Sequence, residues 1–150
     1  MLRRFTFFLT IAMLLMLDHP RMIGAEPGSD VLGTWVFHVT IAGSEPCECT
    51  QIATLHADSS LEGPGNDHFT GEARGVWAKT GANKVSLTFA QNSFNKDGTA
   101  SGYYTVSGTM TLAGRNAGSG SSTFTLKNNR GMVLASGKAT FTSERLEAAH

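Results

Sequence analysis

The segment from Gly33 to Ala42, GTWVFHVTIA, decides the fold of this chain. Its large apolar side chains recur at every second position, at Trp35, Phe37, Val39 and Ile41. Alternate residues of an extended chain point to the same face, so this spacing differs from the three-to-four-residue spacing of a helix. The pattern predicts a β-strand that buries one face.

Six further segments show similar strand character: 50–58, 72–79, 84–92, 102–113, 121–127 and 132–144. Turn-forming sequences separate several of them, including residues 80–83, 96–98 and 128–131. The chain is also rich in glycine and threonine, which suit turns and pleated surfaces better than helices. We therefore expect an all-β protein with seven strands, the two longest of which could each bend and count twice.

The first 25 residues differ from the remainder. Arg3 and Arg4 precede an apolar run over residues 5–17, polar residues 18–21 end the run, and Ile23-Gly24-Ala25 ends in a small residue. The run is shorter than the roughly 20 residues that a membrane-spanning helix needs. The pattern predicts a signal peptide over residues 1–25 and one domain over residues 26–150, with no stable membrane span after cleavage. The expected localisation is secreted or periplasmic.

Charge excludes one large class of partner. The full chain has a formal net charge of zero, and removal of residues 1–25 leaves an acidic excess of two. Nucleic-acid binding depends on basic side chains that neutralise phosphates, so we expect no nucleic-acid partner.

Short hairpins in a domain of this length close most simply into one antiparallel up-and-down barrel of about 7–8 strands, because closure removes exposed edges. A two-sheet sandwich is the alternative. Two longer loops, residues 59–70 and 114–120, are expected to rim the mouth of a cavity.

Gly33-Thr34-Trp35 resembles the opening strand of the calycin group, which includes lipocalins and avidins. In that group the tryptophan closes one barrel end and an arginine of the last strand lies across it. The resemblance implies structural roles for Gly33, Trp35 and Arg145. Avidin-like biotin sites use several tryptophans, whereas residues 26–150 hold only Trp35 and Trp77, which argues against biotin.

Several segments also resemble small bacterial lipocalin-like barrels: Gly75-Val76-Trp77, Leu87-Thr88-Phe89, residues 95–99, Val106-Ser107-Gly108-Thr109 and residues 136–141. Related barrels resemble allene oxide cyclases and pericyclic cyclases, which catalyse ring closure. The resemblance implies a fold and leaves binding and catalysis both open.

A lipocalin-like interior would bind a small apolar molecule. The expected lining residues are Trp35, Phe37, Trp77, Phe89, Gln91, Tyr104, Met110 and Phe124. The alternative is that these side chains simply fill a barrel of eight strands. A filled barrel would have a structural or interaction role.

Cys47 and Cys49 are the only cysteines of the chain. In an oxidising compartment they could form a strained local disulfide or disulfides across a homodimer. The pair could also remain as free thiols or bind a metal with His38 or His56, although a C-x-C pair alone is a poor zinc signature. We expect a disulfide and no metal.

The chain has no recognised catalytic motif. An enzyme of this kind would be a cofactor-independent cyclase or isomerase, because a shaped pocket and a few hydrogen-bond donors suffice for ring closure. Tyr103 and Tyr104 face opposite ways on one strand, so one should offer an interior hydroxyl. No cofactor is expected, and the sequence leaves open whether the protein forms a homodimer.

Overall fold

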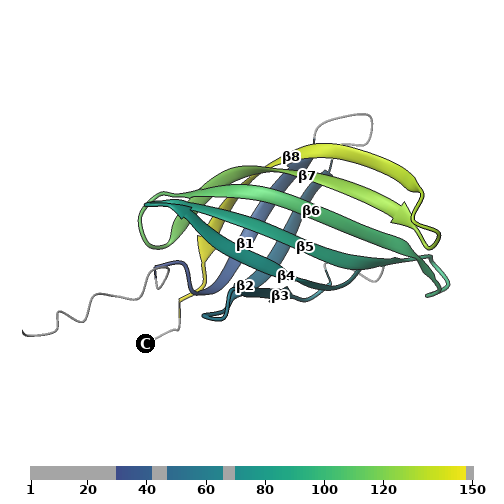
Figure 1. The fold of residues 1–150 in the computed structure, drawn as a ribbon, viewed down its shortest axis with the longest axis horizontal. Helices are drawn as coiled ribbons and strands as arrows, with labels where there is room; N and C mark the ends of the chain where they lie inside the picture. The colour runs from purple at the N-terminus through teal and green to yellow at the C-terminus, as the bar shows by residue number, and fades with distance from the viewer. Residues whose placement is uncertain (1–29, 42–46, 66–69, 148–150) are drawn as a thin grey trace, which may run out of the picture.

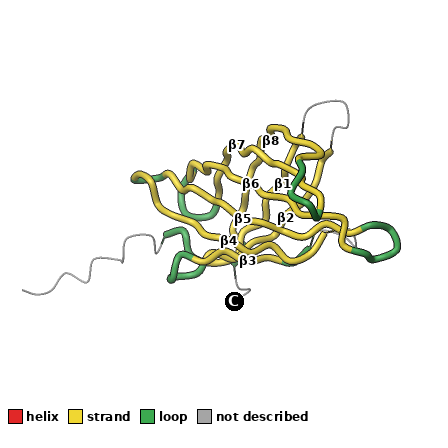
Figure 2. The backbone as a smooth tube through the Cα atoms, turned by 45° about the vertical axis from the view of Figure 1, so that its right-hand side comes forward, coloured by secondary structure: helices red, strands yellow, loops and turns green. Residues whose placement is uncertain are grey.

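The computed structural model describes residues 30–41, 47–65 and 70–147, and they form a closed antiparallel barrel. Each strand pairs with the next along the chain, and the last pairs with the first (Figure 1). The prediction of an all-β up-and-down barrel is confirmed, and Figure 2 shows strands and loops with no helix in the described part. The strands are β1 (Gly33–Ile41), β2 (Cys47–Leu55), β3 (Ser60–Gly63), β4 (Thr70–Gly81), β5 (Lys84–Phe94), β6 (Ala100–Leu112), β7 (Ala117–Asn128) and β8 (Val133–Arg145).

The eighth strand is a separate short strand and not a second half of one of the two longest strands. It is the four-residue β3, which lies inside the segment expected to be a loop and pairs with both β2 and β4. Too short to show an alternating pattern, β3 has one buried apolar residue, Leu61. The Gly and Pro residues that follow β3 are typical of loops, so the local sequence predicts a loop at this position. The expected 59–70 loop is therefore wrong for residues 60–63.

The second expected loop, residues 114–120, is also too long, because β7 begins at Ala117. Gly118 and Gly120 are strand residues rather than turn residues. A Cβ on Gly118 would come within 3.1 Å of Met110 Cγ, and one on Gly120 within 2.6 Å of the Phe141 ring. These glycines make room for neighbouring side chains. The remaining turn lies at the opposite barrel end from the connection between β3 and β4, so the two loops do not share one rim.

Strand length makes the barrel asymmetric. The first three strands have 9, 9 and 4 residues, whereas β4 to β8 have 11 to 13. The long strands extend past the short ones at the end that carries the β5–β6 and β7–β8 turns (Figure 1). We call this the open end, and the end with the β4–β5 and β6–β7 turns the sealed end.

The core fills the sealed end. Its fully buried side chains include Val31, Trp35, Leu55, Leu61, Val85 and Met110. Trp35 Nε1 donates to Val31 O at 2.8 Å, and Trp77 Nε1 donates to His56 O at 2.8 Å. Each indole therefore gains apolar contact while its polar atom is bonded.

Candidate functional site

The inward face of the long strands at the open end is apolar and only half-buried. Phe89, Val106 and Phe124 lie side by side on β5, β6 and β7, in register with one another. Tyr104 and Leu126 form the next row toward the open end. All five face the barrel interior and retain partial exposure. We call them the open-end cluster.

Side chains on the same inward face are buried at the sealed end. Phe37 and Phe141 pack edge to face, with ring centroids 5.5 Å apart and an interplanar angle of 75°. Trp35, Trp77 and Met110 are buried in the same core. The structure thus divides the eight expected lining residues. Trp35, Phe37, Trp77 and Met110 belong to the sealed core, while Phe89, Tyr104 and Phe124 belong to the open-end cluster.

The eighth expected lining residue, Gln91, is buried beside this cluster. Its Nε2 donates to Gly71 O at 3.2 Å, and its register partner on β6 is Tyr104. One row farther toward the open end, the Ser93 and Ser101 hydroxyls are 2.9 Å apart. Gln51, on the opposite wall, donates to Ile52 O at 3.1 Å and to Pro64 O at 3.3 Å. Polar groups therefore stand next to an apolar surface.

Glycines create space for the rings of the open-end cluster. A Cβ on Gly137 would lie 2.8 Å from the Phe124 ring, and one on Gly75 would lie 2.6 Å from Phe89 Cβ. In the sequence these two glycines stand out only within the segments that resemble lipocalin-like barrels. Leu126 is not among the expected lining residues, although its alternation with Phe124 in the same strand indicates an inward position.

Arg145 lies over Trp35 at the sealed end, with its guanidinium carbon 5.2 Å from the ring centroid. Its Nη2 donates to Asp30 O at 2.7 Å. Gly33 has a φ of +119°, a conformation that favours glycine and starts β1 beside this arginine. These contacts join the two chain ends of the described barrel.

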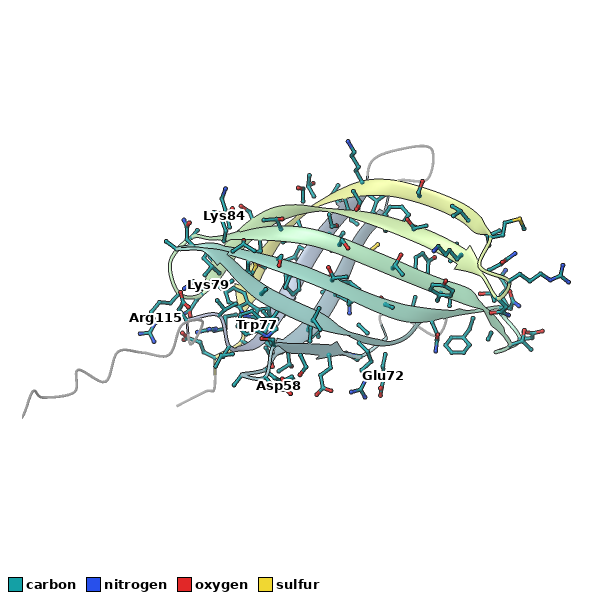
Figure 3. All side chains as sticks on the ribbon, viewed as in Figure 1. Asp58, Glu72, Trp77, Lys79, Lys84 and Arg115 are labelled. Carbon is teal, nitrogen blue, oxygen red and sulfur yellow. The ribbon has the colours of Figure 1, made fainter. Side chains whose placement is uncertain are left out.

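The Asp30 carboxylate accepts two hydrogen bonds from Lys79 Nζ, at 2.8 and 2.9 Å. The hydrogen bond from Lys79 lowers the pKa of Asp30 below its usual 3.8. Lys79, Trp77 and Arg115 are labelled in Figure 3, and all three lie at the sealed end. This ion pair lies on the opposite end of the barrel from the open-end cluster.

The other resolved pKa shifts also belong to the outer surface or to turns. Bonds from Ser60 lower the pKa of Asp58, and bonds from Thr99 lower the pKa of Asp97. Arg74 is paired with Glu72 and Glu62, which raise its pKa. These interactions order turns and strands, and none adjoins the open-end cluster.

Two hollows of the described residues are lined mainly by outward-facing side chains. One, of about 640 Å³, is lined mainly by outward Ser and Thr residues of β5 to β8 with Thr40 and Lys138, and also by Gly108, Ser122 and Ala139 at inward positions. The other, of about 300 Å³, adjoins Glu62, Glu72 and Arg74. A ligand-binding interpretation of the interior therefore rests on the exposure of inward-facing side chains rather than on an enclosed cavity.

Cys49 is disulfide-bonded, but the Cys47 side chain lies outside the described residues, so the pairing of Cys47 with Cys49 stays a prediction. His38 is exposed, with Nε2 3.7 Å from Glu144 Oε1, and His56 Nε2 is 3.2 Å from Glu62 Oε1. Within the described ranges no three His, Cys, Asp or Glu residues gather as a metal site would require.

Comparison of the chain with protein-family models, curated proteins and solved structures finds no match. The part of the chain that the structure describes contains no helix that could cross a bilayer.

Proposed function

We propose that this protein is a secreted or periplasmic, lipocalin-like barrel that binds a small apolar molecule in the open half of its interior. One observation carries the proposal. The open-end cluster faces the barrel interior yet stays partly exposed, whereas the same inward face is buried at the sealed end. An apolar ligand that covers these side chains removes their apolar surface from water, which stabilises the complex.

The shape of the barrel supports binding from one side only. Trp35, Val31 and Arg145 seal one end, and the strands that carry the cluster extend past β1 to β3 at the other. Gln91 and Tyr104 add hydrogen-bonding groups beside the apolar surface. The favoured ligand is therefore largely apolar with one polar group. The signal-peptide pattern of residues 1–25 supports an extracytoplasmic location.

The test uses N-phenyl-1-naphthylamine, an uncharged apolar probe whose fluorescence rises in apolar surroundings. Val106→Asp places a carboxylate in the open-end cluster, where burial under the probe is costly. We expect the dissociation constant of the probe to rise at least tenfold. Ser107→Asp is the matched control, because the neighbouring side chain is exposed on the outer face, and we expect a change below twofold.

Circular dichroism of both variants verifies that the barrel is retained. Equal effects of Val106→Asp and Ser107→Asp, or no saturable binding by the wild type, would contradict the proposal. The second of these outcomes would favour a filled barrel with a structural or interaction role.

A cofactor-independent cyclase or isomerase is the second candidate. The observation that favours it is the pairing of Gln91 and Tyr104 in register on the inward face, since a ring-closing site needs donors at an apolar surface. Native mass spectrometry of the exported protein detects a bound molecule, and chromatography of the released molecule separates the two functions, because isomers have the same mass. A carrier returns the molecule that it took up, whereas an enzyme returns an isomer of it.

A further inference from the structure

Two glutamines are buried at inward positions of the barrel. Gln51 on β2 and Gln91 on β5 are each only 7% exposed, although glutamine usually lies at the surface. The backbone orients both amides, because Gln51 Nε2 donates to Pro64 O at 3.3 Å and Gln91 Nε2 donates to Gly71 O at 3.2 Å. Among the described residues no group donates to either Oε1, so each side chain retains a hydrogen-bond acceptor. We call this pair of residues the interior glutamines.

The interior glutamines bond to the same wall of the barrel. Gly63, at the end of β3, pairs with Ala73 of β4. Just beyond that pair, a Cβ on Gly65 would lie 3.2 Å from Gly71 O. Pro64 and Gly71, whose carbonyls accept from the glutamines, therefore belong to adjacent segments of chain. One amide reaches this wall from β2 and the other from β5, so the wall of β3 and β4 is polar on its inner side.

The opposite wall is apolar. In the closed strand order β3 and β7 are four strands apart, and Figure 1 shows them on opposite sides of the barrel. β7 carries Phe124 and Leu126 of the open-end cluster, and the neighbouring β6 carries Val106. A ligand between the two walls would meet apolar side chains on one side and amide groups on the other. Such an arrangement orients a ligand that has one polar group.

Charged side chains are confined to the sealed end on the inward face of the described strands. They are Lys79, which pairs with the Asp30 carboxylate, and Arg145, which donates to Asp30 O. Lys96 and Arg130 belong to turns at the open end, where both are exposed. An ionised ligand group in the open half would lose its water without gaining an opposite charge, which is costly. The interior therefore favours a neutral ligand.

We propose that the ligand of the open half is uncharged and donates a hydrogen bond, from a hydroxyl or an amide N–H, to Gln91 Oε1. This inference rests on the proposed function and specifies the class of its ligand, which is a long-chain alcohol or a neutral amide rather than a fatty acid. Gln91 is the favoured acceptor because its register partner, Tyr104, belongs to the open-end cluster. Gln51 completes the polar wall, and the hydrocarbon part of the ligand covers the cluster.

The test compares two isomers, 1-decanol and 1-methoxynonane, as competitors of N-phenyl-1-naphthylamine on the wild-type protein. The two molecules have the same atoms, but the ether has no hydrogen-bond donor. One neutral hydrogen bond should make the alcohol bind about fivefold more tightly than the ether. Decanoate, ionised at pH 8, should bind about tenfold more weakly than the alcohol, because no inward cation of the open half meets its carboxylate.

Gln91→Met keeps the length of the side chain but removes the amide. The preference for the alcohol over the ether should then fall below about twofold, while the dissociation constant of the probe stays within about threefold of the wild type. Asn92→Met is the matched control, because it removes the amide of the neighbouring exposed residue on the outer face, and it should retain the full preference. Circular dichroism verifies that both variants keep the barrel.

Equal binding of the two isomers, or a preference for the alcohol that survives Gln91→Met, would overturn this inference while the proposed function stands. Tighter binding of decanoate than of 1-decanol would also overturn it, and loss of that binding in Lys96→Gln or Arg130→Gln would assign the carboxylate to the turns. Absence of saturable probe binding by the wild type would overturn the proposed function and this inference together.

Discussion

The two ends of the barrel are built from the same strands yet differ in packing. On β5, Val85 and Leu87 are buried at the sealed end, whereas Phe89 on the same face is only partly covered. The sealed core has side chains from β1 to β6, from β8 and from Val31, while the open end depends mainly on β4 to β8. Unequal strand length, rather than a change in residue type, therefore separates core from accessible surface.

The comparison extends to polar atoms. At the sealed end both indole N–H groups and the Arg145 guanidinium bond to backbone carbonyls. At the open end Gln91 bonds to Gly71 O next to partly exposed apolar rings. The sealed end is thus organised for stability, and the open end retains both apolar area and hydrogen-bonding groups.

The largest expected difference between the ends is in stability. Trp35→Ala removes a fully buried ring and its hydrogen bond, so it should lower the free energy of unfolding by about 3–5 kcal/mol. Phe124→Ala, at the open end, should cost only about 1–2 kcal/mol because the ring is already partly exposed. Urea denaturation followed by circular dichroism measures both. Equal losses would remove the distinction between the two ends.

Adding a methyl group tests space at each end. Gly120→Ala would place Cβ 2.0 Å from Thr109 O, which is backbone, and should cost about 2–3 kcal/mol. Gly137→Ala meets the half-exposed Phe124 ring, which can turn aside, so a cost of about 1 kcal/mol is expected together with altered probe binding. Thermal unfolding and probe titration are the measurements. A larger stability loss for Gly137→Ala would show that the open end is the more tightly packed one.

Arg145→Met tests the seal itself. The substitution keeps an apolar stem over Trp35 but removes the charge over the ring and the hydrogen bond to Asp30 O, so a loss of about 1–2 kcal/mol is expected. Urea denaturation measures the loss. Probe binding at the far end should stay within twofold of the wild type, and a larger change would mean that the two ends are coupled.

The smallest expected effect concerns pH. Lys79 lowers the pKa of Asp30 below 3.8, so this carboxylate contributes stability that is complete above pH 3.8 and is lost as the pH falls through its folded value. Lys79→Met should cost at most about 1 kcal/mol near pH 7, because the pair is partly exposed. The difference from the wild type should shrink below pH 3.8 in acid-unfolding curves. A constant difference down to pH 2 would assign the loss to something other than this ion pair.

Sequence reasoning predicted the barrel better than it predicted the site. Alternation in β1, β5 and β6 was strong enough to define strands, and short turns favoured closure. The sequence does not predict β3, because four residues are too few to show an alternating pattern. Gly118 and Gly120 fall in an expected loop because glycine is common in turns and also occurs in strands where a neighbouring side chain needs the space. Alternation also indicates only which face is inward. It does not say how far along the barrel a residue lies from the seal, so Met110 and Phe124 were grouped together.

By itself the sequence determined the strand pattern, the inward face and the hairpin connections, because these follow from local alternation and turn chemistry. Only the tertiary structure decided which half of the interior is filled, where Arg145 and Asp30 close the barrel, and how far β8 pairs with the described residues of β1. Those features depend on the register and relative length of strands far apart in the chain, and local sequence preferences do not specify either quantity.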